Sequence, residues 1–483
     1  MTTLPATPLV VGFDLDMTLI DSRPGVRAVW EELARLTGTP IDAGQAASRL
    51  GPPLTLELGR WFPSDQIEPM AQLYRSLYPG LAIEPTPAMP GAADALAAVR
   101  RHGGRSLVVT AKHEGNAELH VQHLDLPVDT VVGGLWGEGK AAALGEHAAS
   151  VYVGDHVLDV AGARAAGALS VAVASGPCSA EELAGAGADV ILDDLTQFVP
   201  WLDGRMLDRR LAALETRLRA LGSVLVAFSG GADSALLLAA AVRALDPSRV
   251  AAATAVSGSL PDTELAAARR FAAELGVRWL SPHTHEMERE GYRANAGDRC
   301  YFCKAELLEV LGPMATAHGL ACVATGTNAD DIVAGFRPGI RAAAERGAVT
   351  PLLDAGLTKD QVRAASARWG LPTWDKPAAA CLSSRIAYGV EVTPHRLARV
   401  ERAEVGLRAV LATAGRTVRD LRVRDLGDGA RVEVDRDLVS WVRDSAEASA
   451  VLADAGFSAA EVDPRGFRSG SMNELLTDRE RYR

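Results

Sequence analysis

The sequence feature that most constrains the fold is an apolar run that ends in a glycine-containing turn. Residues 224–228 are apolar, and they are followed by Ser229-Gly230-Gly231-Ala232-Asp233-Ser234. An alanine- and leucine-rich run, 235–244, comes next. This order predicts a buried parallel strand, a phosphate-binding loop and the N-terminus of a helix. Because Gly230 and Gly231 lack a Cβ, backbone N–H groups there can approach phosphate oxygens, and Ser229 and Ser234 add hydroxyl donors.

Asp233 is a carboxylate beside the expected phosphate site, and a Mg²⁺ ion between the two would explain it. The loop is not a Walker motif, since no lysine follows Gly231. It resembles the PP-loop of ATP pyrophosphatases, which release pyrophosphate and leave AMP on an oxygen of the substrate. The resemblance implies an ATP site at Ser229, Gly230, Gly231, Asp233 and Ser234, with Asp233 also as a metal ligand. The alternative is an ordinary strand–turn–helix unit built from small residues.

Length and composition restrict the class of protein. A chain of 483 residues is too long for one core, so we expect two or three domains. The net charge of −11 argues against a nucleic-acid binder, and no apolar run reaches the ~20 residues of a membrane span. Acidic residues begin at Asp14, so we expect no signal peptide. Five cysteines suggest reduced thiols. We expect a cytoplasmic protein that contacts neither membrane nor nucleic acid.

Polar side chains follow the predicted strands of the first half. Asp14 and Asp16 end the strand 9–13, Thr110 ends 106–109, and Asp155 follows 151–153 with Asp159 four residues on. Lys140 opens a helix. The period of two puts Asp14 and Asp16 on one side of the strand end. Two such carboxylates suit a Mg²⁺ site, with one free to attack phosphorus.

Together these motifs resemble the haloacid dehalogenase (HAD) superfamily over residues 6–198. The resemblance implies Asp14 as nucleophile and Asp16 as general acid/base, both also at the metal. It implies Thr110 and Lys140 on the phosphoryl group, and Asp155 and Asp159 at Mg²⁺. Met17 stands where glycine is commoner. Residues 21–90 look like a small helical cap that selects substrate. The alternatives are a polar strand edge without chemistry, or a degenerate domain kept for docking.

Residues 200–204 interrupt the pattern of the first half. A charged amphipathic helix is expected over 207–221, with Leu207, Leu211, Leu214 and Leu218 on one face. We therefore place a domain boundary near residue 203, between a HAD-like domain over 1–202 and a second domain over 203–483.

Strands and helices alternate in the second half. Residues 250–256 and 321–324 read as strands, and 262–275 as a helix, which predicts a parallel doubly wound sheet with the loop at its carboxyl edge. A strand pair, 421–424 and 430–434, turns at residues 427–429. The expected fold class is α/β: two doubly wound parallel-sheet domains, and a smaller α+β region from about residue 390.

Several polar motifs add to the PP-loop. They are Arg299-Cys300-Tyr301-Phe302-Cys303-Lys304, 325–331, 336–339, 373–377, Ala380-Cys381-Leu382-Ser383-Ser384-Arg385 and 466–473. From Ser229 to Asn473 the chain closely resembles the LarE family of ATP-dependent sacrificial sulfur transferases, which act in making the nickel-pincer nucleotide cofactor. The resemblance implies that ATP adenylates a carboxylate of a pyridinium dicarboxylate mononucleotide. A cysteine thiolate then forms a thioester, and Cβ–S cleavage leaves a thiocarboxylate and dehydroalanine.

Matching positions make Cys381 the sacrificial cysteine. We expect Thr327, Asn328 and Asp330 at ATP. We expect Arg337, Arg385, Arg422 and Arg424 to bind a phosphate or carboxylate group of the substrate. Arg422 and Arg424 share one strand face, and a guanidinium pair there suits a phosphate; a solvated strand face is the alternative.

The residues around Cys381 also favour a reactive thiol, but less strongly than the LarE resemblance does. Lys376 and Arg385 flank it and could supply the positive charge that a nucleophilic cysteine needs. The alternative is a buried, inert cysteine. Cys300 and Cys303 form a C-x-x-C, which has too few ligands for a metal unless Cys381 is a third. A structural or substrate-loop role is favoured, and a three-cysteine cluster stays open. Cys322 is expected in the core.

Two other functions compete with sulfur transfer. A PP-loop ligase could make an amide from ammonia. No glutaminase domain is evident in the sequence, however, and amide formation would not need Cys381. A non-catalytic assembly protein would not need complete motifs in both halves. We expect ATP and Mg²⁺ as cofactors, a small-molecule nucleotide substrate and a homo-oligomer.

Overall fold

The structure is a computed structural model that describes residues 9–49, 53–333, 338–377, 381–468 and 471–472. The chain divides into two compact units, Met1–Met206 (unit 1) and Leu207–Arg483 (unit 2). Arg337, to which the sequence assigns a substrate role, lies outside the described residues. Among the described residues, no helix is both long enough and apolar enough to cross a bilayer.

The boundary between the units lies inside one helix, α10 (Phe198–Leu221). The expected interruption at residues 200–204 was wrong, because the helix runs through both Pro200 and Gly204. Pro200 is the third residue of α10, and the N–H groups of a first turn have no intrahelical partner to lose. The predicted apolar stripe is confirmed: Leu207, Leu211, Leu214 and Leu218 are all buried.

Unit 1 is built on a six-stranded sheet whose pairings are all parallel, in the order β3-β2-β1-β4-β5-β6. Its strands are β1 (Val10–Phe13), β2 (Arg105–Val109), β3 (Thr130–Val132), β4 (Val151–Gly154), β5 (Leu169–Val173) and β6 (Val190–Leu192). The chain order reverses around β1, so the carboxyl ends of β1, β2 and β4 lie side by side, where sheets of this kind bind ligands.

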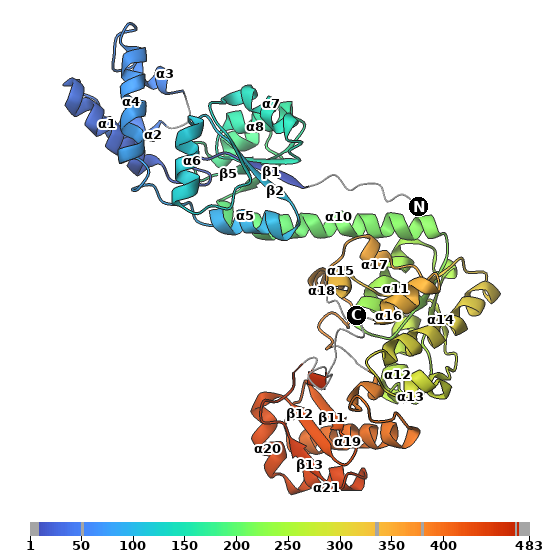
Figure 1. Cartoon of the computed structure of the whole chain (residues 1–483). Coiled ribbons are helices and arrows are strands. Elements are labelled where there is room, and N and C mark those ends of the chain that lie inside the picture. Colours follow the sequence, from blue (N-terminus) through green and yellow to red (C-terminus); the bar gives the residue numbers. More distant parts are fainter. Residues whose placement is uncertain (1–8, 50–52, 334–337, 378–380, 469–470, 473–483) are drawn as a thin grey trace. The chain divides into compact units, whose positions relative to one another are not determined.

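The helices of unit 1 form two groups. Figure 1 shows the first four together, in blue, apart from the strands of the unit. They are α1 (Arg23–Thr37), α2 (Ala43–Ser48), α3 (Leu54–Leu58) and α4 (Ile67–Leu81). They have a core of their own around Trp30 and Tyr74, whose ring centroids lie 5.1 Å apart, as expected for a cap. The others are α5 (Ala92–Arg101), α6 (Glu114–His123), η1 (Gly137–Gly139), α7 (Lys140–Glu146), α8 (Val157–Ala165), α9 (Ala180–Gly185) and η2 (Leu195–Gln197).

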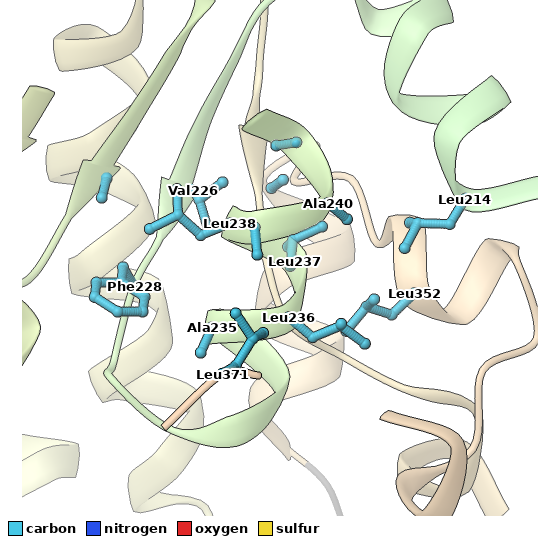
Figure 2. Close-up of a cluster of buried hydrophobic side chains, with 14 of the residues drawn as sticks. Leu214, Val226, Phe228, Ala235, Leu236, Leu237, Leu238, Ala240, Leu352 and Leu371 are labelled. Atoms are coloured by element: carbon cyan, nitrogen blue, oxygen red, sulfur yellow. The ribbon is translucent and has the colours of Figure 1, made fainter. Parts of the chain in front are cut away.

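Unit 2 begins with a four-stranded parallel sheet in the order β10-β7-β8-β9. Its strands are β7 (Val224–Ala227), β8 (Val250–Ala253), β9 (Arg278–Leu280) and β10 (Val323–Ala324). The helix after the PP-loop, α11 (Ala232–Ala244), is buried on nearly every side, which explains its run of alanine and leucine. Leu236, Leu237 and Leu238 lie in one cluster with Val226, Phe228, Leu352 and Leu371 (Figure 2). This packing fixes the loop between β7 and α11.

The other helices of this part of unit 2 follow in chain order up to the C-terminal region. They are η3 (Pro247–Arg249), α12 (Asp262–Glu274), η4 (Glu286–Glu288), α13 (Glu290–Arg293), α14 (Arg299–Ala317), α15 (Ala329–Val333), α16 (Pro338–Glu345), α17 (Pro351–Asp354) and α18 (Lys359–Arg368).

The C-terminal part of unit 2 is a smaller α+β region, as expected. Its three-stranded sheet has the order β11-β12-β13, with an antiparallel β11–β12 pair that confirms the predicted hairpin. The elements are η5 (Leu382–Arg385), α19 (Pro394–Thr413), β11 (Leu421–Asp425), β12 (Ala430–Val434), η6 (Arg436–Leu438), α20 (Val439–Asp444), α21 (Ala446–Asp454) and β13 (Ala460–Val462).

Candidate active sites

Three carboxylates meet at the carboxyl edge of the unit 1 sheet. Asp14 follows β1, Asp155 follows β4, and Asp159 lies in the first turn of α8; one oxygen of each lies within 4.8 Å of the others. Burial raises the pKa of Asp14 to about 7 against the opposing charge of Lys140. The pKa of Asp155 is also raised, first by burial and then by the charges of Asp14 and Asp159. A divalent cation would offset this repulsion, so the donor set fits Mg²⁺.

Lys140 and Thr110 lie at the same place. The Lys140 ammonium is 2.7 Å from Asp14 Oδ1 and 2.6 Å from Asp159 Oδ1, and it is almost fully buried. Lys140 opens α7, as the sequence predicts. Thr110 follows β2, is buried, and lines a cavity of about 360 Å³ together with Asp14, Asp16 and Lys140. The sequence-predicted residues of the first half therefore surround one cavity.

Asp16 lines this cavity but lies outside the three-carboxylate group. Its Oδ1 is 2.9 Å from the Lys112 ammonium, which donates to the Tyr78 hydroxyl on α4 at 2.5 Å. That hydroxyl is 3.0 Å from His120 Nε2 on α6. Lys112 and Tyr78 thus link the general acid/base candidate to the cap. Sequence analysis missed both, although Lys112 stands only two residues after Thr110.

Met17 adopts a left-handed backbone conformation, with φ of 62°. This region favours glycine, which explains why glycine is the commoner residue there. The Met17 carbonyl accepts a 2.8 Å hydrogen bond from Ser175 Oγ, and its side chain is buried. The turn therefore forms without glycine.

The PP-loop has the geometry that the sequence predicts. Gly230 has φ of 72°, and Ser229 Oγ lies 3.2 Å from Ser234 Oγ across the turn. Lys376 donates to the Gly230 carbonyl at 3.0 Å and pairs with Glu264 at 2.6 Å. The Lys376 ammonium is therefore engaged at the loop, and its supply of charge to Cys381 stays a prediction.

The 325–331 segment meets the PP-loop. Asn328 Nδ2 donates to Asp233 Oδ1 at 3.0 Å, and Thr327 lines a cavity with Ser229, Asp233 and Ser234. Asp330 Oδ2 accepts the backbone N–H of Lys359 at 2.7 Å. The Lys359 ammonium pairs with Asp233. Thr327 and Asn328 therefore lie at the loop, whereas Asp330 is linked to it through Lys359, a cation of the site that sequence analysis missed.

Cys381 lines the same cavity as the PP-loop. The cavity has a volume of about 370 Å³, and its wall includes Ser229, Asp233, Cys303 and Glu286. Burial raises the pKa of the Cys303 thiol, with smaller contributions from the charges of Cys381 and Glu286. One cavity is therefore lined by both the loop and Cys381.

A buried polar network holds the turn at Cys381. Ser259 Oγ lies 2.5 Å from the Tyr292 hydroxyl and 2.8 Å from Ser383 Oγ, and the Leu382 N–H donates to the Ser259 carbonyl at 2.9 Å. Arg299, at the start of α14, donates to the Ser383 carbonyl at 2.8 Å. Burial lowers the pKa of Arg299, but the charges of Cys381 and Cys300 outweigh it and the net pKa is raised.

A pyridinium-3,5-bisthiocarboxylic acid mononucleotide synthase of Lactiplantibacillus plantarum is 33% identical to this chain over 272 residues, 56% of this chain and 96% of the relative. The chain belongs to this family, LarE. A protein of Synechocystis sp. is 40% identical over 275 residues, 56% of this chain and all of that one. The asparagine synthase family model matches residues 207–404.

The first half of this LarE-family chain is a HAD domain. The haloacid dehalogenase-like hydrolase model matches residues 11–164, and a second HAD-hydrolase-like model matches residues 138–198. A haloacid dehalogenase-like hydrolase of Streptococcus pneumoniae has 23% sequence identity; it covers 41% of this chain and 99% of its own, with a TM-score of 0.37. The two halves are therefore a HAD hydrolase domain and a LarE-type PP-loop domain.

Arg422 and Arg424, expected at the LarE substrate, are buried rather than on a solvated strand face. Arg424 pairs with Glu433 at 2.7 Å and donates to the Ser384 carbonyl at 3.3 Å. Burial and the charge of Arg385 lower the pKa of Arg422 to about 10. Arg385 pairs with Glu404 and donates to the Cys381 carbonyl. Substrate binding by Arg385, Arg422 and Arg424 stays a prediction, and Arg385 contacts the backbone of Cys381.

The other LarE-half cysteines differ in burial. Cys300 is exposed and Cys303 half-buried, both in the first two turns of α14. Within the described ranges, Asp14, Asp155 and Asp159 are the only His, Cys, Asp and Glu residues grouped closely enough to hold a metal. Cys322 precedes β10 and is half-buried, with its thiol 3.8 Å from the Ser223 carbonyl.

We predict that Asp233→Ala lowers AMP formation by the LarE half by about 100-fold or more, because it removes the carboxylate held by Lys359 and Asn328 in the PP-loop. AMP release with substrate and ATP measures the effect. Asp360→Ala is the matched control, since this exposed aspartate lies next to Lys359. AMP formation near the parent rate in Asp233→Ala would remove this loop as the ATP site.

Proposed function

We propose that the second half is an ATP-dependent sulfur transferase. It adenylates a carboxylate of a pyridinium dicarboxylate mononucleotide and donates the sulfur of its own Cys381, in biosynthesis of the nickel-pincer nucleotide. One observation carries this proposal: Cys381 and the PP-loop line one cavity. Sulfur transfer needs a thiol that can attack an acyl-adenylate, and in this cavity the adenylate would form at the loop beside Cys381. The name of the Lactiplantibacillus plantarum relative supports the choice of substrate class.

The residues of the cavity have separate roles in the proposed reaction. Backbone N–H groups at Gly230 and Gly231, with the hydroxyls of Ser229 and Ser234, hold the ATP phosphates. Asp233 would supply a single protein ligand to a Mg²⁺ that neutralises phosphate charge, with phosphate oxygens as further ligands. The Cys381 thiolate attacks the acyl-adenylate, AMP leaves, and a thioester joins protein and substrate. Cβ–S cleavage then leaves the sulfur on the substrate.

We propose that the first half hydrolyses a phosphate monoester. Asp14 attacks phosphorus, and Asp16 first protonates the leaving group and then activates water. Thr110 and Lys140 hold the phosphoryl oxygens, while Asp14, Asp155 and Asp159 would hold Mg²⁺. The ion supplies positive charge to the transferring phosphoryl group. The close approach of Lys140 to Asp14 supports this assignment.

Intact-mass measurement after one turnover tests the sulfur transferase. Protein incubated with ATP, Mg²⁺ and the dicarboxylate mononucleotide should lose about 34 Da, the mass of one sulfur and two hydrogens, since cysteine oxidation would instead leave the sulfur in place. Peptide mapping should locate dehydroalanine at position 381, and an added thiol should trap it. Sulfur transfer with position 381 unchanged in mass after many turnovers would contradict a sacrificial role.

A second candidate is sulfur transfer through a cluster or persulfide. The position of Cys303 in the cavity wall beside Cys381 favours it, with Cys300 one turn away on α14. A cluster-based enzyme would turn over with free sulfide, a persulfide-based one would need a donor that supplies sulfane sulfur, and both would keep all cysteines. Loss of activity in Cys300→Ala and Cys303→Ala, with an intact Cys381 mass, would select this function. A PP-loop amide ligase would instead consume ammonia and tolerate Cys381→Ala.

A further inference from the structure

The backbone carbonyl of Cys381 accepts three hydrogen bonds. Ser384 donates its N–H at 3.0 Å and its hydroxyl at 2.7 Å, and Arg385 donates Nη1–H at 2.9 Å. The 3₁₀ turn η5 accounts for the bond from the Ser384 N–H. It does not require a hydroxyl and a guanidinium on the same oxygen. This carbonyl is next to the Cα and Cβ of the proposed sulfur donor.

The Arg385 guanidinium is held in place from its other side. Its Nε and Nη2 lie 3.0 and 3.2 Å from the two carboxylate oxygens of Glu404 on α19, and both side chains are nearly buried. Glu404 Oε1 also accepts the Val423 N–H of β11 at 3.0 Å. This forked contact directs Nη1 towards the Cys381 carbonyl. Donors that are fixed before the reaction stabilise developing negative charge without reorganisation.

Negative charge develops on this carbonyl only if Cys381 loses its Cα proton. Sulfur donation ends with cleavage of the Cβ–S bond, and the residue becomes dehydroalanine. When the Cα proton leaves first, the electron pair on Cα delocalises into the adjacent carbonyl as an enolate. Hydrogen bonds to that oxygen strengthen as its charge grows, which lowers the barrier to elimination.

We infer that Ser384 and Arg385 form an oxyanion hole for the enolate of Cys381, and that sulfur leaves by elimination from this anion. The inference rests on the proposed function. A carboxylate of the cavity wall takes the Cα proton; Glu286 is buried and lines this cavity with Cys381. The pair on Cα then forms the Cα=Cβ bond, and the Cβ–S pair leaves with sulfur as the substrate thiocarboxylate. No oxidant or reductant is needed.

The test follows the thioester adduct, which is protein plus substrate acyl group, by rapid-quench intact mass with ATP, Mg²⁺ and the dicarboxylate mononucleotide. In Ser384→Ala, the adduct should form at the parent rate and convert to dehydroalanine about 100-fold more slowly, so it accumulates. Arg385→Lys keeps the charge but loses the fork, and it should also accumulate adduct. Thermal unfolding checks that each variant folds.

Ser383→Ala is the matched control. It removes a hydroxyl from the same turn, and that hydroxyl contacts Ser259 and Tyr292 rather than the Cys381 carbonyl. This variant should not accumulate adduct. In Arg385→Ala, added guanidinium ion should restore the conversion step, as expected when the missing group acts on the reaction.

The outcomes separate two failures. Slow conversion in Ser384→Ala or Arg385→Lys, with adduct formation retained, supports the oxyanion hole. Conversion at the parent rate in both variants overturns the oxyanion hole. Equal slowing of adduct formation and of conversion in both variants also overturns it, because that result indicates a purely structural role. If wild-type protein forms no adduct and keeps its sulfur, the proposed sulfur donation has failed as well.

Discussion

Asp14→Asn should abolish Mg²⁺-dependent hydrolysis of a phosphate monoester by the HAD domain. The change is nearly isosteric, but an amide cannot attack phosphorus as a carboxylate does, and the expected loss is about 1,000-fold or more. Asp14 lies 2.7 Å from the Lys140 ammonium and shares a site with Asp155 and Asp159, the residues that would hold the phosphoryl group and Mg²⁺. Hydrolysis of p-nitrophenyl phosphate, a generic ester, measures the effect.

Asp65→Asn is the control for this loss, since Asp65 is an exposed aspartate in the cap region and the charge change is the same. Chelation of Mg²⁺ should remove wild-type hydrolysis, and readdition should restore it. AMP formation by the second half should survive in Asp14→Asn. Hydrolysis at the parent rate in this variant would take the nucleophile role away from Asp14.

Cys381→Ala should transfer no sulfur while still forming AMP from ATP and substrate. The methyl group cannot attack the acyl-adenylate, so the expected loss of thiocarboxylate product is complete within detection. The cavity keeps its PP-loop residues, and Asp233 keeps its contacts with Asn328 and Lys359. Mass spectrometry of the nucleotide product, with AMP release followed in parallel, measures the two steps separately.

Cys322→Ala is the matched control, because this thiol contacts the Ser223 carbonyl beside β10 and is absent from the cavity wall. It should keep sulfur transfer. Cys300→Ala should keep at least part of the activity if Cys381 is the donor. Thiocarboxylate formation by Cys381→Ala at the parent rate would contradict the proposal that Cys381 donates the sulfur.

The parts of the fold and sites that sequence predicts are those with local signals. Asp14, Asp155 and Thr110 each follow an apolar strand, and parallel strands bring their carboxyl ends to one edge. The PP-loop is similar, because Gly230 and Ser234 stand at fixed offsets from β7. Each of these motifs specifies its own local backbone geometry, so the sequence alone identifies its residues.

Residues that join a site from a distant segment carry no such signal. Lys359 pairs with Asp233 from 126 positions away, and Tyr292 contacts Ser383 from 91. Lys376 is a further case, because its ammonium donates to the Gly230 carbonyl of the PP-loop from 146 positions away, and the sequence gives no sign of that contact. At residues 200–204 the composition suggested a break, but a proline in a first turn disturbs no helix.

The bonds that hold the turn at Cys381 have a consequence for the protein after it has reacted. The three donors on the carbonyl and the bond from Leu382 to Ser259 all go to backbone atoms, and none goes to sulfur. A chain that has given up its sulfur would therefore keep this scaffold and its ATP loop. Such exhausted molecules would still bind nucleotide and compete with fresh ones, so cofactor yield would follow the rate at which new chains are made and old ones are cleared.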